Sequence, residues 1–238
     1  MNVAFVIPTY NEAANIQKLI PQIAKVMHDT VTHTTYKIII VDDESPDGTG
    51  RIVDVLAKKY PVYVIHRKIR NGLGEAYKTG LKYGLRTADL IFSMDADLSH
   101  NPKRIPAMIA AAKHADVVIG SRYISGGGVV NWPWHRKLLS KGANTLAAMI
   151  LGLNAHDCTS GYRCYRKKVL TSIDLNSIHS NGYSFLEDIL YRCVRKEFKL
   201  AEIPIVFKDR VRGVSKLSKK ELWRFFLTLL RLRLGLKT

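Results

Sequence analysis

Short apolar runs alternate with longer amphipathic segments through the first half of the chain. The apolar runs predict five strands, at residues 2–8, 36–41, 62–66, 90–94 and 116–120. The segments between them carry apolar residues at helical spacing and predict helices at residues 12–28, 50–60, 74–86 and 102–113. Asn11 is the expected N-cap of the first helix, and Pro102 is expected to open the last. Because alternating strands and helices form βαβ units, the pattern predicts an α/β fold with a mostly parallel central sheet and helices on both faces.

The pattern changes after Ser121. Residues 122–134 are rich in glycine and end in Trp132-Pro133-Trp134. Helices are then expected at residues 135–153, 183–196 and 219–234, with an extended piece at 198–207 and a basic loop at 208–216. We interpret the chain as a single domain, residues 1–238. In it, residues 1–121 form a nucleotide-binding half, and residues 122–238 form an acceptor half that ends in amphipathic helices.

Polar side chains follow three of the predicted strands at the points where these strands end. The clusters are Thr9 to Glu12, Asp42 to Ser45 and Asp95 to Asp97. Ligands of parallel sheets bind at the carboxyl ends of the strands, so these clusters are expected to converge on one site. The dinucleotide motif GxGxxG does not follow the first strand, and no Walker A loop is present. The site is therefore expected to be neither an ordinary Rossmann nor a P-loop site.

Asp95 and Asp97 follow a buried strand with one small residue between them. Two like charges so close repel each other unless a positive charge lies between them. A bend in the chain would direct both carboxylates at one hard divalent cation, Mg²⁺ or Mn²⁺, that keeps positions open for phosphate oxygens. The alternative is a turn in which an aspartate caps the helix that Pro102 opens. The acidic groups at the other two strand ends favour the metal site.

The chain is strongly basic, with 37 Lys and Arg against 20 Asp and Glu and a formal net charge of +17. Such a charge predicts anionic partners: nucleic acid, a phosphate-bearing substrate or an anionic membrane. A non-catalytic nucleic-acid-binding protein is disfavoured, because acidic strand ends repel phosphate and no nucleic-acid-binding signature is present. Cys158, Cys164 and Cys193 form no CxxC pair and are expected to be reduced thiols of the protein interior. No signal peptide and no transmembrane run are recognisable, which favours a soluble or peripheral protein.

Several motifs together resemble the family 2 glycosyltransferases. They are VIPTYNEAANI, VDDESPDGT, MDADLSHNP, GSRY, NWPWHRKLLSKGAN and RVRGVSKL, in the family's order and over nearly the whole chain. Within that family they are similar to the dolichol-phosphate (polyprenol-phosphate) mannose synthases, here without a transmembrane extension. The pair formed by the NWPWHRKLLS and RGxSK elements is more specific than the common DxD motif.

The resemblance implies the GT-A nucleotide-sugar fold and assigns roles to residues. The nucleoside would be held by Pro8, Tyr10, Glu12, Val41 and Asp43. The metal on the donor diphosphate would be held by Asp95 and Asp97, with the Ala96 backbone beside it. The donor phosphates would be clamped by Arg122, Arg210 and Lys216, and the acceptor phosphate would be bound by Arg136 and Ser140. Some relatives carry Gln at a third metal position where this chain has Ser99, which leaves the metal preference open.

The implied reaction moves mannose from GDP-mannose to dolichyl or polyprenyl phosphate, with inversion to a β-linked lipid product. A phosphate monoester is mostly dianionic at pH 7, so it needs cationic positioning and no general base. We therefore expect Glu187 and Asp188, which resemble the acidic pair of relatives with hydroxyl acceptors, to be structural. Asp42 is expected to orient its strand end, His100 to serve a turn, and Asn71-Gly72 to begin a helix. UDP-glucose or UDP-N-acetylglucosamine remains the alternative donor.

A lipid-linked acceptor has to stay in the bilayer while its phosphate enters the site. The segment 219–234 mixes apolar and basic side chains, and residues 143–153 are largely apolar. One interpretation is a core-packing helix with a solvated basic face. The other, favoured by a lipid acceptor, is a helix lying on an anionic membrane at its cytoplasmic face, alone or with a separate membrane-anchoring subunit.

Overall fold

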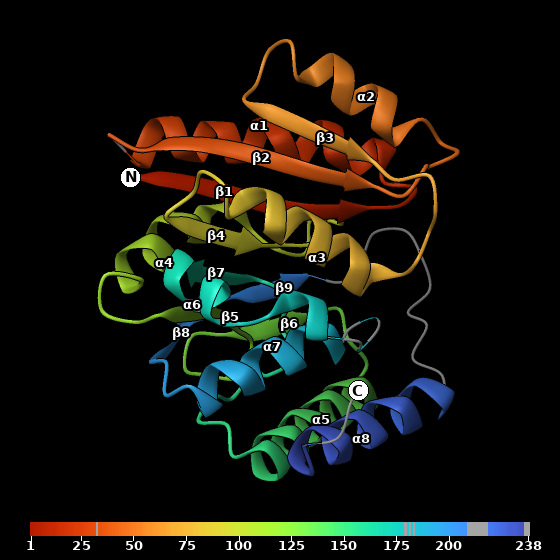
Figure 1. Ribbon diagram of the computed structural model, residues 1–238, viewed down its shortest axis with the longest axis vertical. Helices are drawn as coiled ribbons and strands as arrows, with labels where there is room; N and C mark the ends of the chain where they lie inside the picture. The colour runs from red at the N-terminus through yellow and green to blue at the C-terminus, as the bar shows by residue number, and fades with distance from the viewer. Residues whose placement is uncertain (32, 179, 181, 183, 209–218, 236–238) are drawn as a thin grey trace.

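Figure 1 shows a computed structural model of the protein. It describes residues 1–238 except 32, 179, 181, 183, 209–218 and 236–238. For residues 219–225 it describes the backbone alone. A seven-stranded sheet runs through the molecule in the order β3-β2-β1-β4-β7-β5-β8. The strands of this sheet are β1 (Asn2–Thr9), β2 (Thr35–Asp42), β3 (Val62–His66), β4 (Leu90–Ser93), β5 (Val117–Ser121), β7 (Arg163–Arg166) and β8 (Leu200–Pro204). All pairings are parallel except those of β7, which lies antiparallel between β4 and β5. A second, parallel pair joins β6 (Gly128–Val130) to β9 (Val206–Lys208).

Helices cover both faces of the large sheet, as the sequence pattern predicts. One face packs against α1 (Ala13–Thr30), α2 (Thr49–Leu56) and α4 (Ile105–Ala111), the last preceded by a 3-10 turn, η1 (Pro102–Arg104). The other face packs against α3 (Leu73–Gly84), α5 (Trp134–Leu151), α6 (Lys167–Ser172), α7 (Ser184–Arg195) and α8 (Lys219–Arg233). A short 3-10 turn, η2 (Leu175–Ser177), precedes α7. In β1, Val3, Phe5 and Ile7 belong to the first core, whereas Ala4 and Val6 belong to the second.

Helices α5 and α8 lie side by side at one end of the molecule, far from α2 at the other end (Figure 1). Leu229 and Leu232 of α8 are buried in the same core as Ala147 and Leu151 of α5. No helix in the described part of the chain combines the length and the apolar character that crossing a bilayer requires.

Helix α3 approaches β1 closely at Gly80. A Cβ atom placed on Gly80 would lie 2.3 Å from Cγ1 of Val6 and 3.0 Å from Cγ2 of Val41. Only glycine fits this crossing, so the backbone of α3 is held against the sheet at a fixed height. The helix begins after Gly72, whose φ of +92° is left-handed, and this confirms Asn71-Gly72 as a helix start.

The five predicted strands and the helices between them are confirmed, with ends that agree to within four residues. Asn11 is not the N-cap: α1 follows Glu12, and no side chain caps it. The reason is local, because Asn11 has a left-handed φ of 61° and its backbone N–H donates to Oγ of Ser45 at 3.1 Å. Strand β7 and helix α6 lie in a stretch for which the hydrophobic pattern predicted no element.

The chain turns sharply at each of the three polar strand ends. Asn11, Glu44 and Leu98 have positive φ values of 61°, 49° and 65°, although none of them is glycine. Non-glycine residues seldom adopt this conformation, because it raises the energy of the backbone. Residues that do adopt it are often found at functional sites. The loops after β1, β2 and β4 are therefore held in unusual shapes at the same edge of the sheet.

Candidate functional site

Asp95 is held from two directions just beyond the end of β4. The hydroxyl of Tyr77, from α3, donates to Oδ1 of Asp95 at 2.8 Å. The backbone N–H of Asp95 donates to Nδ1 of His100 at 2.9 Å. Tyr77 and His100 are both buried, at 0% and 2% exposure, so both contacts are made by side chains of the protein interior. His100 thus serves the turn, as the sequence indicates.

Asp97 accepts two hydrogen bonds from the residue two positions later. The backbone N–H and the hydroxyl of Ser99 donate to Oδ1 of Asp97 at 3.1 and 2.5 Å. Ser99 therefore orients the carboxylate of Asp97 through its own hydroxyl. Both groups are nearly buried, at 2% exposure for Ser99 and 9% for Asp97.

The donor set at the end of β4 fits a hard divalent cation. Asp95 and Asp97 offer carboxylate oxygens, which Mg²⁺ and Mn²⁺ prefer. Within the described ranges, no group of three or more His, Cys, Asp or Glu side chains is arranged for a metal. A cation held by these two carboxylates would have coordination positions open for water and for a bound diphosphate. Such incomplete protein coordination is typical of magnesium sites that act on nucleotides.

The residues assigned to the nucleoside lie on adjacent strands. Pro8 of β1 and Val41 of β2 are direct partners in the parallel register. Tyr10 is 36% exposed, and the guanidinium carbon of Arg70 lies 3.6 Å from the centre of its ring. The backbone N–H of Glu12 donates to the Thr49 hydroxyl at 2.9 Å, which ties the loop after β1 to α2.

Asp42 and Asp43 have different environments although they are neighbours. Asp42 accepts hydrogen bonds from the Thr9 hydroxyl at 2.9 Å and from the backbone and hydroxyl of Ser45 at 3.0 and 2.6 Å. It therefore orients the strand end, as expected. Asp43 lies 3.3 Å from Nε of Arg67. Burial raises the pKa of Asp43 above its ordinary value, against the opposing effect of Arg67 and Arg70.

Arg122 follows β5 and is fixed by a buried carboxylate. Its Nε and Nη2 atoms donate to Asp157 at 2.7 Å each, and Nη2 also donates to the Thr159 hydroxyl at 2.7 Å. Burial lowers the pKa of Arg122, but the hydrogen bonds and charge of Asp157 outweigh it and leave the pKa raised. The negative charge of Asp95 acts in the same direction. The Phe207 ring centre lies 5.5 Å from the Arg122 guanidinium carbon and 6.1 Å from the ring centre of His100, which contacts Asp95.

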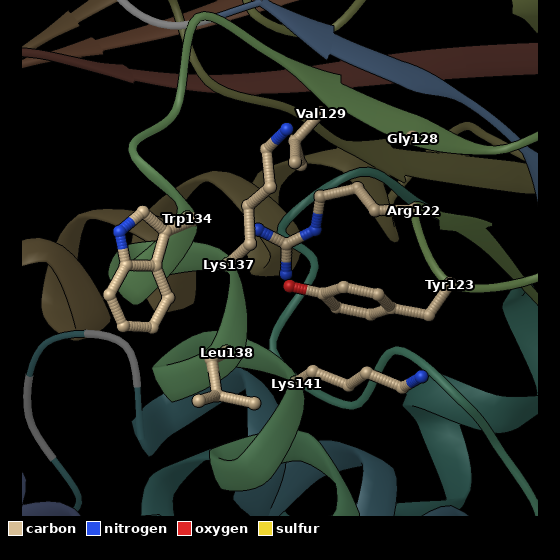
Figure 2. Close-up of a pocket in the computed structure, with 8 residues that line it drawn as sticks. All are labelled: Arg122, Tyr123, Gly128, Val129, Trp134, Lys137, Leu138 and Lys141. Atoms are coloured by element: carbon tan, nitrogen blue, oxygen red, sulfur yellow. The ribbon is translucent and has the colours of Figure 1, made fainter.

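Arg122 also borders a cavity of about 580 Å³ against one face of α5. Figure 2 shows the side chains around it, with the Lys137 side chain extending from α5 toward Val129 and the Arg122 guanidinium above the Tyr123 ring. The lining residues are Arg122, Tyr123, Gly128, Val129, Trp134, Lys137, Leu138 and Lys141. The wall thus combines cationic groups with the apolar surfaces of Trp134 and Leu138.

Arg136 and Ser140 lie on α5, the helix that borders the cavity, but neither is among the residues that line it. The Tyr123 hydroxyl, which lines the cavity, donates to Oγ of Ser140 at 2.7 Å. The guanidinium carbon of Arg136 lies 4.1 Å from the Trp132 ring centre, and that of Arg122 lies 5.7 Å from it. Trp132 therefore contacts both arginines through cation–π interactions. Arg210 and Lys216, assigned to the donor phosphates, lie outside the described residues.

The acidic pair on α7 is buried. Asp188 pairs with Arg192 at 2.5 Å and accepts from the Ser180 hydroxyl at 3.2 Å. Glu187 is 1% exposed, and burial raises its pKa to about 8. Neither residue is presented to solvent, in line with the structural role expected for them.

Three residues of this region were missed by sequence reasoning: Tyr77, Asp157 and Thr159. Tyr77 stands in a helix, where a tyrosine is ordinarily read as a packing residue. Asp157 and Thr159 lie in a loop that no predicted strand precedes. The one available signal was the polar run DCTS between two apolar segments, and it does not indicate a partner for Arg122.

The α/β fold thus presents carboxylates at the end of a central parallel strand, β4, and a fixed arginine, Arg122, after β5. The chain belongs to glycosyl transferase family 2, whose family model matches residues 4–173. It is 45% identical to polyprenol monophosphomannose synthase of Mycolicibacterium smegmatis, over 90% of this chain and 80% of the relative. It is 43% identical to undecaprenyl-phosphate mannosyltransferase of Micrococcus luteus, over 92% and 88%.

A longer relative is the dolichol-phosphate mannosyltransferase of Pyrococcus furiosus, 40% identical over 98% of this chain and 64% of that protein. Among solved structures, glucosyl-3-phosphoglycerate synthase of Mycobacterium tuberculosis aligns with a TM-score of 0.72. The alignment covers 100% of this chain and 81% of that one at 19% identity, so it speaks for the fold alone. Another structure of that enzyme contains Mn²⁺ and UDP. Together with the family match, this likeness confirms the expected GT-A fold.

Proposed function

We propose that the protein transfers mannose from GDP-mannose to dolichyl or another polyprenyl phosphate. The names of the relatives, at 40 to 45% identity, support the acceptor class and the sugar. The donor nucleotide is the finer part of the proposal, and UDP-glucose or UDP-N-acetylglucosamine is the alternative.

The observation that carries the proposal is the position of Arg122 between two different environments. On one side it is linked to the end of β4 through the Phe207 ring, which lies near both the Arg122 guanidinium and the His100 ring that contacts Asp95. On the other side it lines the cavity with Lys137 and Lys141. A donor diphosphate at the carboxylates and an acceptor phosphate in the cavity would thus meet at one fixed guanidinium.

In the proposed reaction an oxygen of the acceptor phosphate attacks the anomeric carbon of the sugar. The bond from that carbon to the nucleoside diphosphate breaks, and the nucleoside diphosphate leaves with the electron pair. Attack from the opposite face inverts the anomeric centre and gives a β-linked product from an α-linked donor. A dianionic phosphate loses one charge and the leaving diphosphate gains one, so no proton has to move.

The environment of Glu187 agrees with a reaction that uses no general base. A base has to reach the proton that it removes. Glu187 is 1% exposed and is kept protonated at neutral pH by a pKa of about 8. The chemistry instead requires cations that offset the repulsion between two anionic substrates. Arg122, Lys137 and Lys141 provide them around the cavity, and Arg136 adds a further cation against the Trp132 ring.

A divalent cation at Asp95 and Asp97 would supply Lewis-acid stabilisation of the charge that develops on the leaving diphosphate. Hydrogen bonds from Tyr77 and Ser99 hold the carboxylates of Asp95 and Asp97 in place. Arg122, fixed by Asp157, stabilises negative charge without having to reorganise, which is the more effective form of electrostatic catalysis.

We further propose that the end of the molecule formed by α5 and α8 lies on an anionic membrane. On α5, Trp134, Leu138 and Met149 are 76%, 65% and 69% exposed. On α8, Leu227 is 45% exposed, and Leu234, directly after the helix, is 70% exposed. Large exposed apolar side chains on two adjacent helices, beside basic groups, are typical of surfaces that enter a lipid interface. The cavity is lined by residues of α5, one of these two helices. A lipid phosphate could therefore enter it from the bilayer.

The direct test is transfer of sugar from GDP-mannose to a short polyprenyl phosphate in detergent, with Mg²⁺ or Mn²⁺. We expect radiolabelled sugar in the organic phase, and none when EDTA is present. Parallel reactions with UDP-glucose and UDP-N-acetylglucosamine identify the donor. Transfer only from a UDP-sugar would replace the mannose assignment and keep the fold and mechanism. No transfer from any donor, together with steep salt-dependent RNA binding, would favour a nucleic-acid-binding protein instead.

A further inference from the structure

We infer that Tyr77 and His100 are positioning residues that hold Asp95 ready for a divalent cation. This inference rests on the proposed function, in which Asp95 binds the metal of the donor diphosphate. It concerns two side chains that contact different atoms of Asp95, one from helix α3 and one from the loop after β4.

The Tyr77 hydroxyl fixes the carboxylate itself. It donates to Oδ1 at 2.8 Å and thereby selects one rotation of the carboxyl group, with Oδ2 as the oxygen that Tyr77 does not occupy. The ring of Tyr77 is fully buried and stacks with Phe185 of α7, with centroids 6.5 Å apart and planes 7° apart. Gly80 holds α3 against β1 one turn later in the same helix. The hydroxyl therefore has a position set by the fold.

His100 fixes the backbone of Asp95. Its Nδ1 accepts from the Asp95 N–H at 2.9 Å, so the ring proton has to be on Nε2. Nε2 lies 3.9 Å from Oδ2 of Asp95, which places the N–H side of the ring near the second carboxylate oxygen. The imidazole is stacked on Tyr162, with centroids 5.0 Å apart and planes 19° apart. The ring thus closes the loop of residues 95–100 and keeps the carboxylate close to it.

Tyr77 and His100 are hydrogen-bond partners of Asp95, which the proposed function makes a metal ligand. Hydrogen-bond partners behind a metal ligand orient it, and their removal typically weakens metal binding by about 10- to 100-fold. Asp95 and Asp97 are the only carboxylates of the DxD segment, and the described residues add no third acidic or imidazole ligand. With so few protein ligands, a loosely held Asp95 would affect cation affinity directly.

The test compares full-length variants by their affinity for Mn²⁺, measured from the EPR signal of the free ion with saturating GDP and, separately, UDP. For the hydroxyl, Tyr77→Phe is paired with Tyr83→Phe, which removes a hydroxyl from the same helix at a ring stacked on Tyr63. For the imidazole, His100→Asn keeps an acceptor where Nδ1 lies, whereas His100→Leu has similar size and removes it. Thermal unfolding of each variant shows whether it is folded.

We expect Tyr77→Phe and His100→Leu to bind Mn²⁺ at least about tenfold more weakly than the unmodified protein, while folded. Tyr83→Phe and His100→Asn should stay close to the unmodified protein. Mn²⁺ affinity that is unchanged in Tyr77→Phe and His100→Leu would overturn the inference and leave the proposed function standing. Loss in His100→Asn as large as in His100→Leu would overturn the role of Nδ1. If the unmodified protein binds no Mn²⁺ with either nucleotide, the proposed metal fails, and this inference with it.

Discussion

The guanidinium of Arg122 is locked by the carboxylate of Asp157 through Nε and Nη2, each at 2.7 Å. Asp157 is completely buried, and it also accepts from the backbone N–H of Arg122 at 2.9 Å. Three donors of one residue thus converge on one carboxylate. An arginine held in this way keeps its charge in one place whether or not substrate is present.

Asp157→Asn is expected to destabilise the protein and to impair transfer, because it leaves Arg122 buried without its counter-charge. Breaking a buried ion pair by removing one partner costs about 3–5 kcal/mol. Urea unfolding measures the free energy, and initial rates of transfer measure the function. The matched control is Asp29→Asn, which removes an exposed ion pair with Lys25 on α1 and should change neither quantity. Equal effects of the two substitutions would contradict the role given to Asp157.

Asp97→Asn is expected to reduce transfer by about three orders of magnitude while the protein stays folded. Stabilisation of a leaving group by a bound cation contributes several kcal/mol to the transition state, and the amide is a poorer ligand than the carboxylate. Asp89→Asn is the control, since Asp89 precedes the same strand at its other end and accepts from the backbone of Asn2 at 2.8 Å. Rates at varied Mn²⁺ would show the loss as metal-dependent. Full activity of Asp97→Asn would remove this residue from the proposed mechanism.

The stability of the protein is expected to fall as the pH rises, because of Glu187. Burial raises its pKa from 4.5 to about 8 in the folded state, so the folded protein holds a proton that the unfolded chain releases. The stabilisation is complete below pH 4.5 and is lost as the pH rises through 8. Glu187→Gln cannot titrate, so its free energy of unfolding should exceed that of the unmodified protein increasingly over this range, by up to about 5 kcal/mol. Parallel pH profiles of the two proteins would show that Glu187 titrates normally.

Two helical glycines are expected to respond oppositely to alanine. At Gly80 the new methyl group would overlap Val6, whose Cγ1 lies 2.3 Å from its position, and overpacking of this kind costs about 1–3 kcal/mol. At Gly142, in α5, nothing lies within 4 Å of that position. Gly142→Ala should therefore stabilise the protein by about 0.5–1 kcal/mol. Thermal unfolding of both variants checks the pair, and a stabilising Gly80→Ala would contradict the close packing of α3 on β1.

Leu138→Glu is expected to weaken binding to vesicles that contain anionic lipid. Leu138 is 65% exposed beside the cavity, and burying a leucine contributes about 1.5–3 kcal/mol, so a loss of about tenfold or more is expected. Val55→Glu is the control, because Val55 is 64% exposed on α2, at the opposite end of the molecule (Figure 1). Flotation with vesicles measures both. Similar losses in the two variants would indicate a general effect of charge instead of a docking surface.

The sequence was most informative where strands are apolar and end in polar residues. The polar clusters after β1, β2 and β4 lie at one edge of the sheet, and Pro8 and Val41, which the family resemblance assigned to the nucleoside, are direct neighbours in the parallel register. Strand β7 escaped prediction because it is four residues long and begins with Arg163, a residue type that normally marks the surface. Arg163 is fully buried because backbone carbonyls of Ser160, Cys158 and Leu186 accept its hydrogen bonds. No local pattern shows that such carbonyls will be available.

The hydrogen bonds of Asp95 could not be predicted from the sequence, for a related reason. Whether the hydroxyl of Tyr77 reaches a carboxylate 18 positions later depends on the angle at which α3 crosses the sheet. That angle follows from Gly80, Val6 and the strand order, and is not encoded near Tyr77. Distant packing therefore decides which side chains support the predicted ones.

The antiparallel strand β7 has a consequence for how this chain can be divided. It comes from the second half of the sequence, yet it lies between β4 and β5 of the first half and pairs with both. A fragment ending at residue 121 would leave two strands of its sheet unbridged, with their backbone hydrogen-bonding groups exposed. The change of sequence pattern after Ser121 therefore does not mark a boundary between two independently folded domains. Each half therefore depends on the other to complete the central sheet.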